Sequence, residues 1–541
     1  MAVPRFSLSQ RTLESKSYGG WSLSGYTCLS VRIGISSRVS FVCLGAAVYF
    51  VSGLVGLAAP AESLILQPAG SPRPLHAPVF GASTATFYEH LLDNPAKIAM
   101  LKTMAIGLDR FPGGSVANFY NWHTGLFEVP TYPNSSRYMQ FWAGAAANIA
   151  REMPQGITLE RYDDFSRQIG AQVILVPNFE SSSVAEQVKW FERLSHAGAV
   201  PERIELGNEY WVAMGNDPRS LARWRDEPAS VRIMQEYVTA LKPYFPPHVK
   251  LAIQAAAGAL DIRGGRFGQR LQQWDEDLRP EPWFDAVTLH LYPRLRDVMG
   301  DAGAGQTPPT PQNALPRLTA MTARVDEGIE HIIQTTEQHL PGKEIWITEW
   351  SPRGADTATE RGGAEPMSPA MEMLTAARMA LVYLRHPSVT AALFFMYSFN
   401  ERDPHAMFVA DGQGGFAPLP AAAALRWLNE AANAGGSFQR LLQAGARPIS
   451  GGGARQESYL PIEGGLFRTE GRTTLILENV SGDTFSLDPV KLMPNRQPAK
   501  VEFISMPNLA DAIKLPAKID SRATSGPVTV TPFSVTRITW N

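Results

Sequence analysis

The sequence predicts an α/β protein built around a (β/α)8 barrel, the TIM-barrel fold, followed by a C-terminal β-sandwich. Eight short apolar runs alternate with helix-like segments between residues 79 and 433. Two of these runs end directly in a glutamate, Glu209 and Glu349, at the strand ends where barrel proteins carry their functional side chains. From about residue 455 the pattern changes to short runs of alternating hydrophobicity separated by turn residues, which is typical of a sandwich.

The barrel prediction depends on strands that are apolar on both faces, because a parallel sheet covered by helices buries both of them. Strands are expected at residues 79–84, 107–111, 172–178, 203–209, 250–256, 284–292, 344–350 and 391–397. Helices are expected at residues 94–106, 183–198, 231–245, 315–339, 367–385 and 419–433. An open, doubly wound sheet is the alternative that shows the same alternation.

The domain borders follow from these patterns. We expect the barrel at residues 79–435 and the sandwich at 436–541, with a lead-in at 62–78 whose LILQPAG segment is a candidate strand of the sandwich. Insertions at 113–158 and 293–313 are rich in Gly, Pro and Asn, and loops of this kind shape the substrate cleft of a barrel.

The N-terminal segment is typical of export. Residues 39–61 carry no charge and end in Ala59-Pro60-Ala61, so residues 1–61 are expected to be a signal peptide cleaved after Ala61 or a single-span membrane anchor. Both cysteines lie in this segment, which leaves the body without thiols for disulfides or metal sites. We therefore expect a secreted or periplasmic protein, or one anchored to the membrane through this segment.

Composition narrows the classes of function. The chain is 44% hydrophobic and 18% charged, with a net charge of −2 and no long Lys/Arg block, so nothing indicates a nucleic-acid partner. It contains no GxSxG, HExxH or P-loop motif, and no cofactor or metal is predicted. A carbohydrate is the expected partner, and the oligomeric state is not predicted.

Glu209 and Glu349 are the candidate catalytic residues. They end the fourth and seventh expected strands, which face each other across a closed eight-stranded barrel. Hydrolysis of a glycosidic bond needs two such carboxyl groups, one to protonate the leaving oxygen and one to attack the sugar or to activate water. The sequence leaves open whether their separation suits a retaining or an inverting reaction.

The chain resembles clan A glycoside hydrolases, which are retaining (β/α)8 enzymes with Asn-Glu ending strand four and Glu ending strand seven. The resemblance implies that Glu209 is the acid/base and Glu349 the nucleophile, and that Asn208 binds the sugar hydroxyl beside the anomeric carbon. LDRFPGGSVANFYNW (108–122) resembles the RYPGG segment of family 51 α-L-arabinofuranosidases and directs Arg110 into the site.

Five further residues are substrate-binding candidates. His290 and Tyr292 in TLHLYP resemble the clan's His-x-Tyr pattern, and their spacing of two places both on one face of the strand. Tyr292 is expected to donate to Glu349. Aromatic platforms for sugar rings are expected at Trp350 and Trp122, and Asn178 ends the third strand as a further polar candidate.

These observations favour an exported retaining glycosidase of α-L-arabinofuranosidase type. A glycosyl-transferring enzyme passes through the same intermediate and is an alternative. Family 39 β-xylosidases and heparanase-like β-glucuronidases share parts of the motifs. An inactive carbohydrate-binding barrel is the alternative from another class, and it gives no chemical reason to keep both glutamates with Arg110, Asn208 and Tyr292.

Overall fold

The computed structural model describes residues 61–541 except 85, 257–269, 271–273, 275–277, 300–307, 353–366, 402–405, 453–455, 495 and 524–525. The chain divides into residues 1–59 and 60–541, and the described residues all belong to the second unit. The expected signal peptide or anchor, apart from Ala61, lies outside the described residues, as does part of the 293–313 insertion. None of the described helices is long and apolar enough to cross a bilayer.

Eight parallel strands close into a barrel in chain order, each hydrogen-bonded to the next and the last to the first. The closed barrel confirms the predicted fold class and excludes the open sheet. The strands are β4 (Phe80–Thr84), β5 (Leu108–Phe111), β8 (Gln172–Leu175), β9 (Arg203–Glu205), β10 (Lys250–Gln254), β11 (Ala286–Leu291), β12 (Glu344–Trp350) and β13 (Val389–Tyr397).

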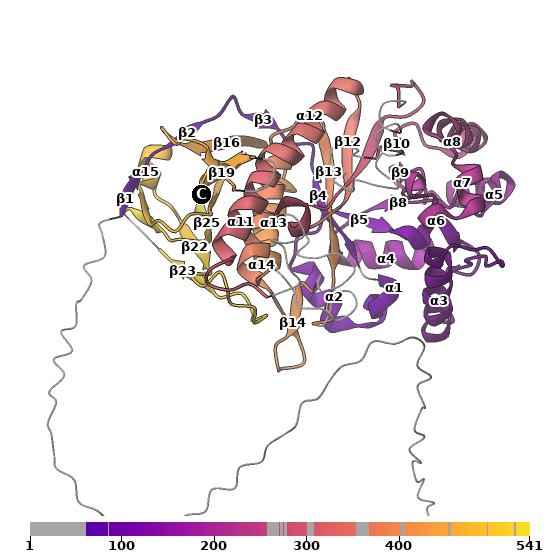
Figure 1. The fold of residues 1–541 in the computed structure, drawn as a ribbon, viewed down its shortest axis with the longest axis horizontal. Helices are drawn as coiled ribbons and strands as arrows, with labels where there is room; N and C mark the ends of the chain where they lie inside the picture. Colours follow the sequence, from indigo (N-terminus) through magenta and orange to yellow (C-terminus); the bar gives the residue numbers. More distant parts are fainter. Residues whose placement is uncertain are drawn as a thin grey trace, which may run out of the picture. The chain divides into compact units, whose positions relative to one another are not determined.

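Helices surround the barrel, and Figure 1 shows α11, α13 and α14 between its strands and the sandwich. α13 is buried along nearly its whole length, because it packs against both domains. The longer helices are α2 (Pro95–Lys102), α3 (Arg137–Glu152), α4 (Leu159–Ile169), α5 (Val184–His196), α8 (Glu227–Leu241), α11 (Ala314–Ala323), α12 (Glu330–His339), α13 (Pro369–Tyr383) and α14 (Pro420–Ala432). Shorter helices include η2 (Ser115–Phe119), α6 (Ala213–Asn216), α7 (Pro218–Arg223), α10 (Leu295–Met299) and the π-helix η6 (Arg324–Ile329).

The interior of the barrel changes from apolar to polar along the strands. Its apolar layer is a separate buried cluster made of Leu108, Ile174, Ala252, Ala286, Trp346, Ala391 and Leu393. Two residues further along their strands, Arg110 follows Leu108 and Thr348 follows Trp346, and both polar side chains are buried. Because side chains at i and i+2 share one face of a strand, the polar layer lies directly above the apolar one at the carboxyl ends.

The C-terminal domain is a sandwich of mostly antiparallel sheets around its own apolar core, with β1 (Glu62–Leu64) and β21 (Phe485–Leu487) as a parallel pair. The lead-in contributes to both sheets, since β1 (Glu62–Leu64) pairs with β21 and β2 (Leu66–Pro68) pairs with β16. The main sheet contains β2, β16 (Ser437–Gln443), β19 (Ile462–Thr469), β20 (Arg472–Asn479), β25 (Ser534–Trp540), β22 (Lys500–Ser505) and β23 (Ile519–Arg522). The smaller sheet contains β1, β21 (Phe485–Leu487) and β24 (Val528–Val530).

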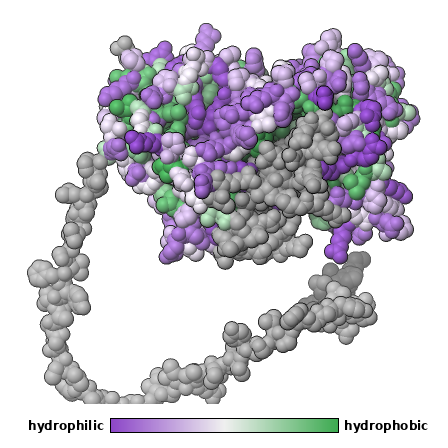
Figure 2. All heavy atoms as spheres, turned by 45° about the horizontal axis from the view of Figure 1, so that its top comes forward, coloured by the Kyte–Doolittle hydropathy of each residue, from purple (hydrophilic) through white to green (hydrophobic). Residues whose placement is uncertain are grey.

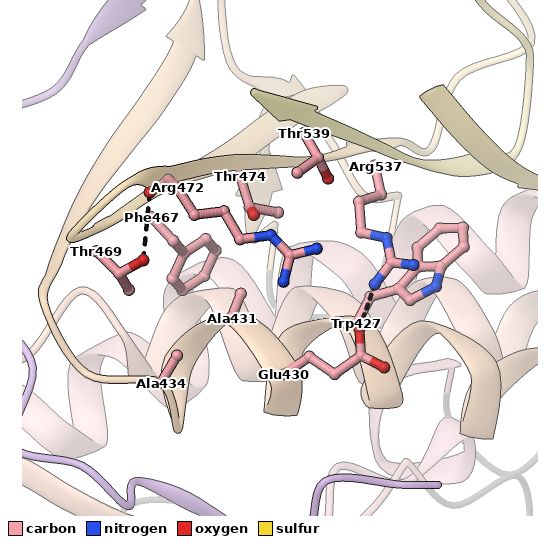
Figure 3. A pocket seen from close by; sticks show the side chains of 10 residues that line it. All are labelled: Trp427, Glu430, Ala431, Ala434, Phe467, Thr469, Arg472, Thr474, Arg537 and Thr539. Atoms are coloured by element: carbon pink, nitrogen blue, oxygen red, sulfur yellow. Dashed lines mark hydrogen bonds and ion pairs between the residues drawn. The ribbon is translucent and has the colours of Figure 1, made fainter. Parts of the chain in front are cut away.

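Charged side chains join the barrel helices to the sandwich. The fully buried Arg378 of α13 donates to Glu478 of β20 across 2.5 Å. Figure 3 shows a pocket between α14 and strands β19, β20 and β25, where Arg537 lies 4.8 Å over the ring of Trp427 and pairs with Glu430. A guanidinium is attracted to the face of an aromatic ring. This contact and the ion pair with Glu430 therefore link α14 to the sheet.

The face of the molecule in Figure 2 is mostly hydrophilic, with apolar side chains in small scattered patches. Such scattered exposure is ordinary for a globular surface. Among the described residues, the large hydrophobic side chains that are strongly exposed include Phe141 of α3 and Ile513, each at 63%.

Candidate active site

Arg110 is the centre of a buried polar cluster at the carboxyl ends of the barrel strands. Its side chain is fully buried and its guanidinium donates four hydrogen bonds. Two go to Glu205, from Nε over 2.6 Å and from Nη2 over 2.8 Å. One goes from Nη1 to Glu349 Oε1 over 2.7 Å, and one from Nη2 to Asn208 Oδ1 over 2.8 Å. One cation therefore positions three of its neighbours, since a guanidinium presents its donors in a rigid plane.

Glu349 is held on both of its carboxylate oxygens. Oε1 accepts from Arg110, and Oε2 accepts from the Tyr292 hydroxyl over 2.5 Å, as the sequence predicts for Tyr292. The pairing of β11 with β12 slips by one residue, from Leu289 opposite Ile347 to His290 opposite Glu349. This irregularity re-aims the strand, so Thr348 and Glu349 both contact residues of the cluster although they are adjacent in sequence.

Glu209 lies beyond the end of β9, and its backbone is left-handed with a φ of 47°. Ala213, Met214 and Asn216 in the loop that follows are also left-handed, with φ between 45° and 62°. Each such non-glycine residue costs on the order of 1–3 kcal/mol, and strain of this kind collects at functional sites. The Glu209 carboxylate bonds to His290 Nδ1 over 2.8 Å.

The separation of the two candidate catalytic groups decides which chemistry they can perform. One carboxylate oxygen of Glu209 and one of Glu349 lie within 4.8 Å of each other. Retaining glycosidases place the two carboxyl groups about 5–5.5 Å apart, whereas inverting ones need about 6.5–9.5 Å to admit a water. This distance between the nearest oxygens agrees with the retaining arrangement and is shorter than the inverting range.

His290 carries a positive charge within this cluster. Burial by itself lowers the pKa of His290, but the surrounding carboxylates raise it to about 10, with Glu349 having the largest of these effects. As an imidazolium, His290 donates from Nδ1 to Glu209 and from Nε2 to Thr348 Oγ1 over 3.1 Å. Thr348 in turn donates to Glu205 over 3.2 Å. Each group in this series of hydrogen bonds, from Glu209 through His290 and Thr348 to Glu205, therefore has a consistent donor or acceptor role.

Three carboxyl groups share two cations in this cluster. Burial raises the pKa of Glu205, but the Arg110 guanidinium more than offsets this and lowers it below the usual value, so Glu205 is ionised. Glu349 also bonds to Arg110, and His290 Nδ1 lies 2.8 Å from Glu209 and 3.6 Å from Glu349. A general acid must hold a proton, and a site with more carboxyl groups than cations favours one protonated carboxyl group.

Asn208 is fixed next to Glu209 and has one hydrogen-bonding group to spare. Asn118 of η2 holds its backbone, donating to the Asn208 carbonyl over 2.8 Å and accepting from its amide over 3.1 Å. The Asn208 Oδ1 accepts from Arg110, while Nδ2 is buried without a partner among the described residues. An unpaired buried donor is costly unless a ligand satisfies it, so this amide is suited to a substrate oxygen.

Four residues of this site are not identified by the sequence analysis: Glu205, Asn118, Thr348 and, from α3, Tyr138. Glu205 and Thr348 contact Arg110 or His290, and Tyr138 interacts electrostatically with Glu209 and Glu349. A glutamate within the apolar segment RIEL, in a barrel whose apolar run LDRF also contains an arginine, is the one sequence signal that indicates Glu205. Tyr138 gives no such signal, because its helix lies in an insertion.

Three sequence-predicted residues, Trp350, Trp122 and Asn178, lie outside the Arg110 cluster, and their contact with a substrate stays a prediction. Trp350 is 1% exposed and packs edge-on against Tyr383 of α13, because it follows the inward-facing Glu349 and points to the other face of β12. Trp122 stacks on His123. The side-chain amide of Asn178 bonds to the loop that follows it: Oδ1 accepts from the Ser181 backbone amide, and Nδ2 donates to the Ser181 hydroxyl.

Glu209, His290 and Glu349 are also close enough to ligate a metal ion, with one ligand atom from each within 4.8 Å of the others. The Arg110 guanidinium nitrogen 2.7 Å from Glu349 opposes a second cation at that carboxylate. The charged state of His290 does the same, since a metal binds only the neutral imidazole. The arrangement therefore suits proton transfer and nucleophilic attack better than metal binding.

The barrel and sandwich are the predicted fold, and solved structures of glycoside hydrolases share it. The chain is similar to the GH51 arabinofuranosidase from Xanthomonas axonopodis pv. citri, with a TM-score of 0.59 and 16% identity over 88% of this chain and 98% of that one. It is similar to a family 51 α-L-arabinofuranosidase from Bifidobacterium longum, with a TM-score of 0.61 and 12% identity over 89% and 99%.

A third similar structure is a family 44 xyloglucanase from Paenibacillus polymyxa, with a TM-score of 0.55 and 10% identity over 89% of this chain and 100% of that one. No family model matches the sequence, and no curated protein matches it. At such low identities the likeness establishes the fold, and the function has to be argued from the site.

Proposed function

We propose that the protein is a retaining glycoside hydrolase, and the observation that carries this is the separation of the Glu209 and Glu349 carboxylate oxygens, within 4.8 Å. Glu349 attacks the anomeric carbon while the Glu209 proton passes to the leaving oxygen, so the glycosidic bond breaks as a glycosyl-enzyme ester forms. Glu209 then takes a proton from water, and the resulting attack on the anomeric carbon releases the sugar and restores the Glu349 carboxylate.

The neighbouring side chains support these roles. His290 bonds to one oxygen of Glu209 over 2.8 Å and so fixes the position of its carboxyl group. Arg110 and Tyr292 each bond to one oxygen of Glu349 and orient its carboxyl group for attack. The spare amide of Asn208 is available to the sugar hydroxyl beside the reacting carbon, where a hydrogen bond strengthens in the transition state.

The leading substrate class is the α-L-arabinofuranosides. The RFPGG segment that carries Arg110 and the likeness to two family 51 arabinofuranosidases support it. Cleavage within a longer polysaccharide is a second candidate, supported by the likeness to the Paenibacillus xyloglucanase. Transfer of the glycosyl group to a sugar acceptor uses the same intermediate and is a further candidate reaction of the same site. We also propose that the enzyme is exported, on the basis of its uncharged N-terminal segment at residues 39–61.

The test is hydrolysis by the full-length protein of aryl α-L-arabinofuranoside, β-D-xyloside, β-D-glucoside and β-D-glucuronide, together with xyloglucan and sugar acceptors. We expect one substrate to react, Glu349→Gln to lose at least about 10³-fold in kcat, and azide to restore turnover of an activated substrate by Glu209→Ala. Glu344→Gln, at the opposite end of the same strand, is the matched control and should stay active. Near-normal turnover by Glu349→Gln would contradict the proposal.

A further inference from the structure

Helix α3 is attached to the loop that carries Glu209. Ser136, its N-cap, donates from Oγ to the Met214 carbonyl over 2.8 Å and from its amide to Asp217 over 3.0 Å. Tyr132, just before the helix, donates to the same Asp217 carboxylate. The first turn of α3 is therefore held beside the segment that follows the acid/base residue, although the two are far apart in the sequence.

Tyr138 brings the first turn of α3 to the site itself. Its hydroxyl shares a hydrogen bond with Ser115 over 2.7 Å. A Cβ placed on Gly215 would lie 2.5 Å from the Tyr138 Cβ, so the two backbones approach as closely as a glycine allows. Burial raises the pKa of Tyr138 to about 12, and Glu209 contributes more to this than Glu349 does. Tyr138 thus stays protonated on the Glu209 side of the site.

Three aromatic side chains lie on one face of this helix, at the i, i+3 and i+4 positions occupied by Tyr138, Phe141 and Trp142. The ring of Trp142 meets Tyr138 edge-on at 5.8 Å and Phe141 edge-on at 5.0 Å. We call this row the α3 ridge. It runs from Tyr138, which contacts Ser115 and Gly215, to Phe141, which is 63% exposed.

Phe141, the exposed end of the α3 ridge, is not one of the buried positions through which α3 packs onto the protein. The fully buried positions of α3 are Met139, Ala146 and Ile149, and Phe141 lies roughly opposite Met139 around the helix. An aromatic ring that is exposed, and continuous with a row of rings entering a site, offers the apolar platform on which a sugar ring stacks.

We propose that the α3 ridge binds the sugar on the leaving-group side of the bond that is cleaved, so that the enzyme prefers a glycan to a substrate with a small leaving group. This inference rests on the proposed function, because Glu209 marks the leaving-group side only if it is the general acid. The ridge adjoins the Glu209 loop, and a sugar leaving from Glu209 therefore passes over Tyr138 toward Phe141.

The test compares two substrates of the full-length enzyme, an arabinofuranosyl oligosaccharide and arabinofuranosyl fluoride, whose leaving group has no ring to stack. Phe141→Ala should lower kcat/KM for the oligosaccharide about tenfold, mainly through KM, and leave the fluoride unchanged. Phe141→Trp should restore the oligosaccharide rate, since it keeps a stacking surface. Ile513→Ala, which removes an equally exposed side chain in the C-terminal domain, is the control and should change neither rate.

The outcomes separate the two proposals. If Phe141→Ala lowers both rates equally, or neither, the α3 ridge is not a sugar site, while cleavage of the fluoride still supports the glycosidase. If Phe141→Ala leaves both rates unchanged and instead dissociates an oligomer in sedimentation, the exposed ring belongs to an interface and the inference is overturned. If the wild-type protein cleaves neither substrate nor any glycoside of the panel, the proposed function itself fails.

Discussion

Replacing Glu205 by glutamine tests the charge balance of the site without changing its shape. The substitution removes one anion from a cluster in which Glu205 accepts two bonds from Arg110 and lies 3.8 Å from His290 Nε2. Two unit charges at that distance interact by about 4 kcal/mol at an effective dielectric constant of about 20. Loss of this interaction should lower the pKa of His290 from about 10 back toward its ordinary value.

The assay is the pH profile of kcat/KM on the substrate found active, together with urea unfolding at pH 6. Removing the negative charge of Glu205 makes it easier for the rest of the cluster to lose protons, so the alkaline limb should move to lower pH by about one pH unit or more. The unfolding free energy should fall by about 3 kcal/mol, the lower end for a broken buried ion pair, because glutamine keeps part of the hydrogen bonding.

Glu478→Gln is the matched control, since Glu478 is also a fully buried carboxyl bound to an arginine but lies in the sandwich. Glu478→Gln should leave the pH profile of kcat/KM unchanged. If Glu205→Gln kept the wild-type alkaline limb and an unfolding free energy within about 1 kcal/mol, the cluster would not depend on the Glu205 charge, and the argument from the balance of carboxyl groups and cations would be wrong.

Two further predictions follow from single contacts. Tyr292→Phe removes the donor to Glu349 Oε2, a charge-assisted bond of about 1.5–3 kcal/mol that helps Glu349 to depart as a carboxylate, so release of the glycosyl group should slow about 10- to 100-fold. A pre-steady-state burst larger than that of the wild type would show it, and an unchanged burst and kcat would contradict it. Burial raises the pKa of Glu478 to about 7, above the ordinary 4.5, despite the opposing effect of Arg378. Its stabilising contribution is full below about pH 4.5 and is lost as the pH rises through about 7, so Glu478→Gln should gain about 3 kcal/mol in unfolding free energy relative to wild type between pH 4 and pH 8. Parallel pH–stability curves of the two proteins would refute this.

Much of the fold is determined by local patterns in the sequence. Apolar runs that alternate with helical periods predict all eight barrel strands in their order, and the closed barrel has them. Glutamate at the ends of the fourth and seventh strands predicts the catalytic pair, and the His-x-Tyr spacing predicts that His290 and Tyr292 face the same side. These features repeat every two or every 3.6 residues, so the chain displays them without reference to distant segments.

The tertiary structure decided what no local pattern contains. If side chains alternated strictly from the inward-facing Trp346, the Glu349 side chain would point away from the lumen. The slipped register between β11 and β12 brings Glu349 in together with Thr348. Glu205 becomes the partner of Arg110 because β5 and β9 close into one barrel, and Tyr138 reaches the site because its helix is bonded to the Glu209 loop. Each of these contacts depends on strand pairing and packing between segments far apart in the sequence, which only the assembled barrel fixes.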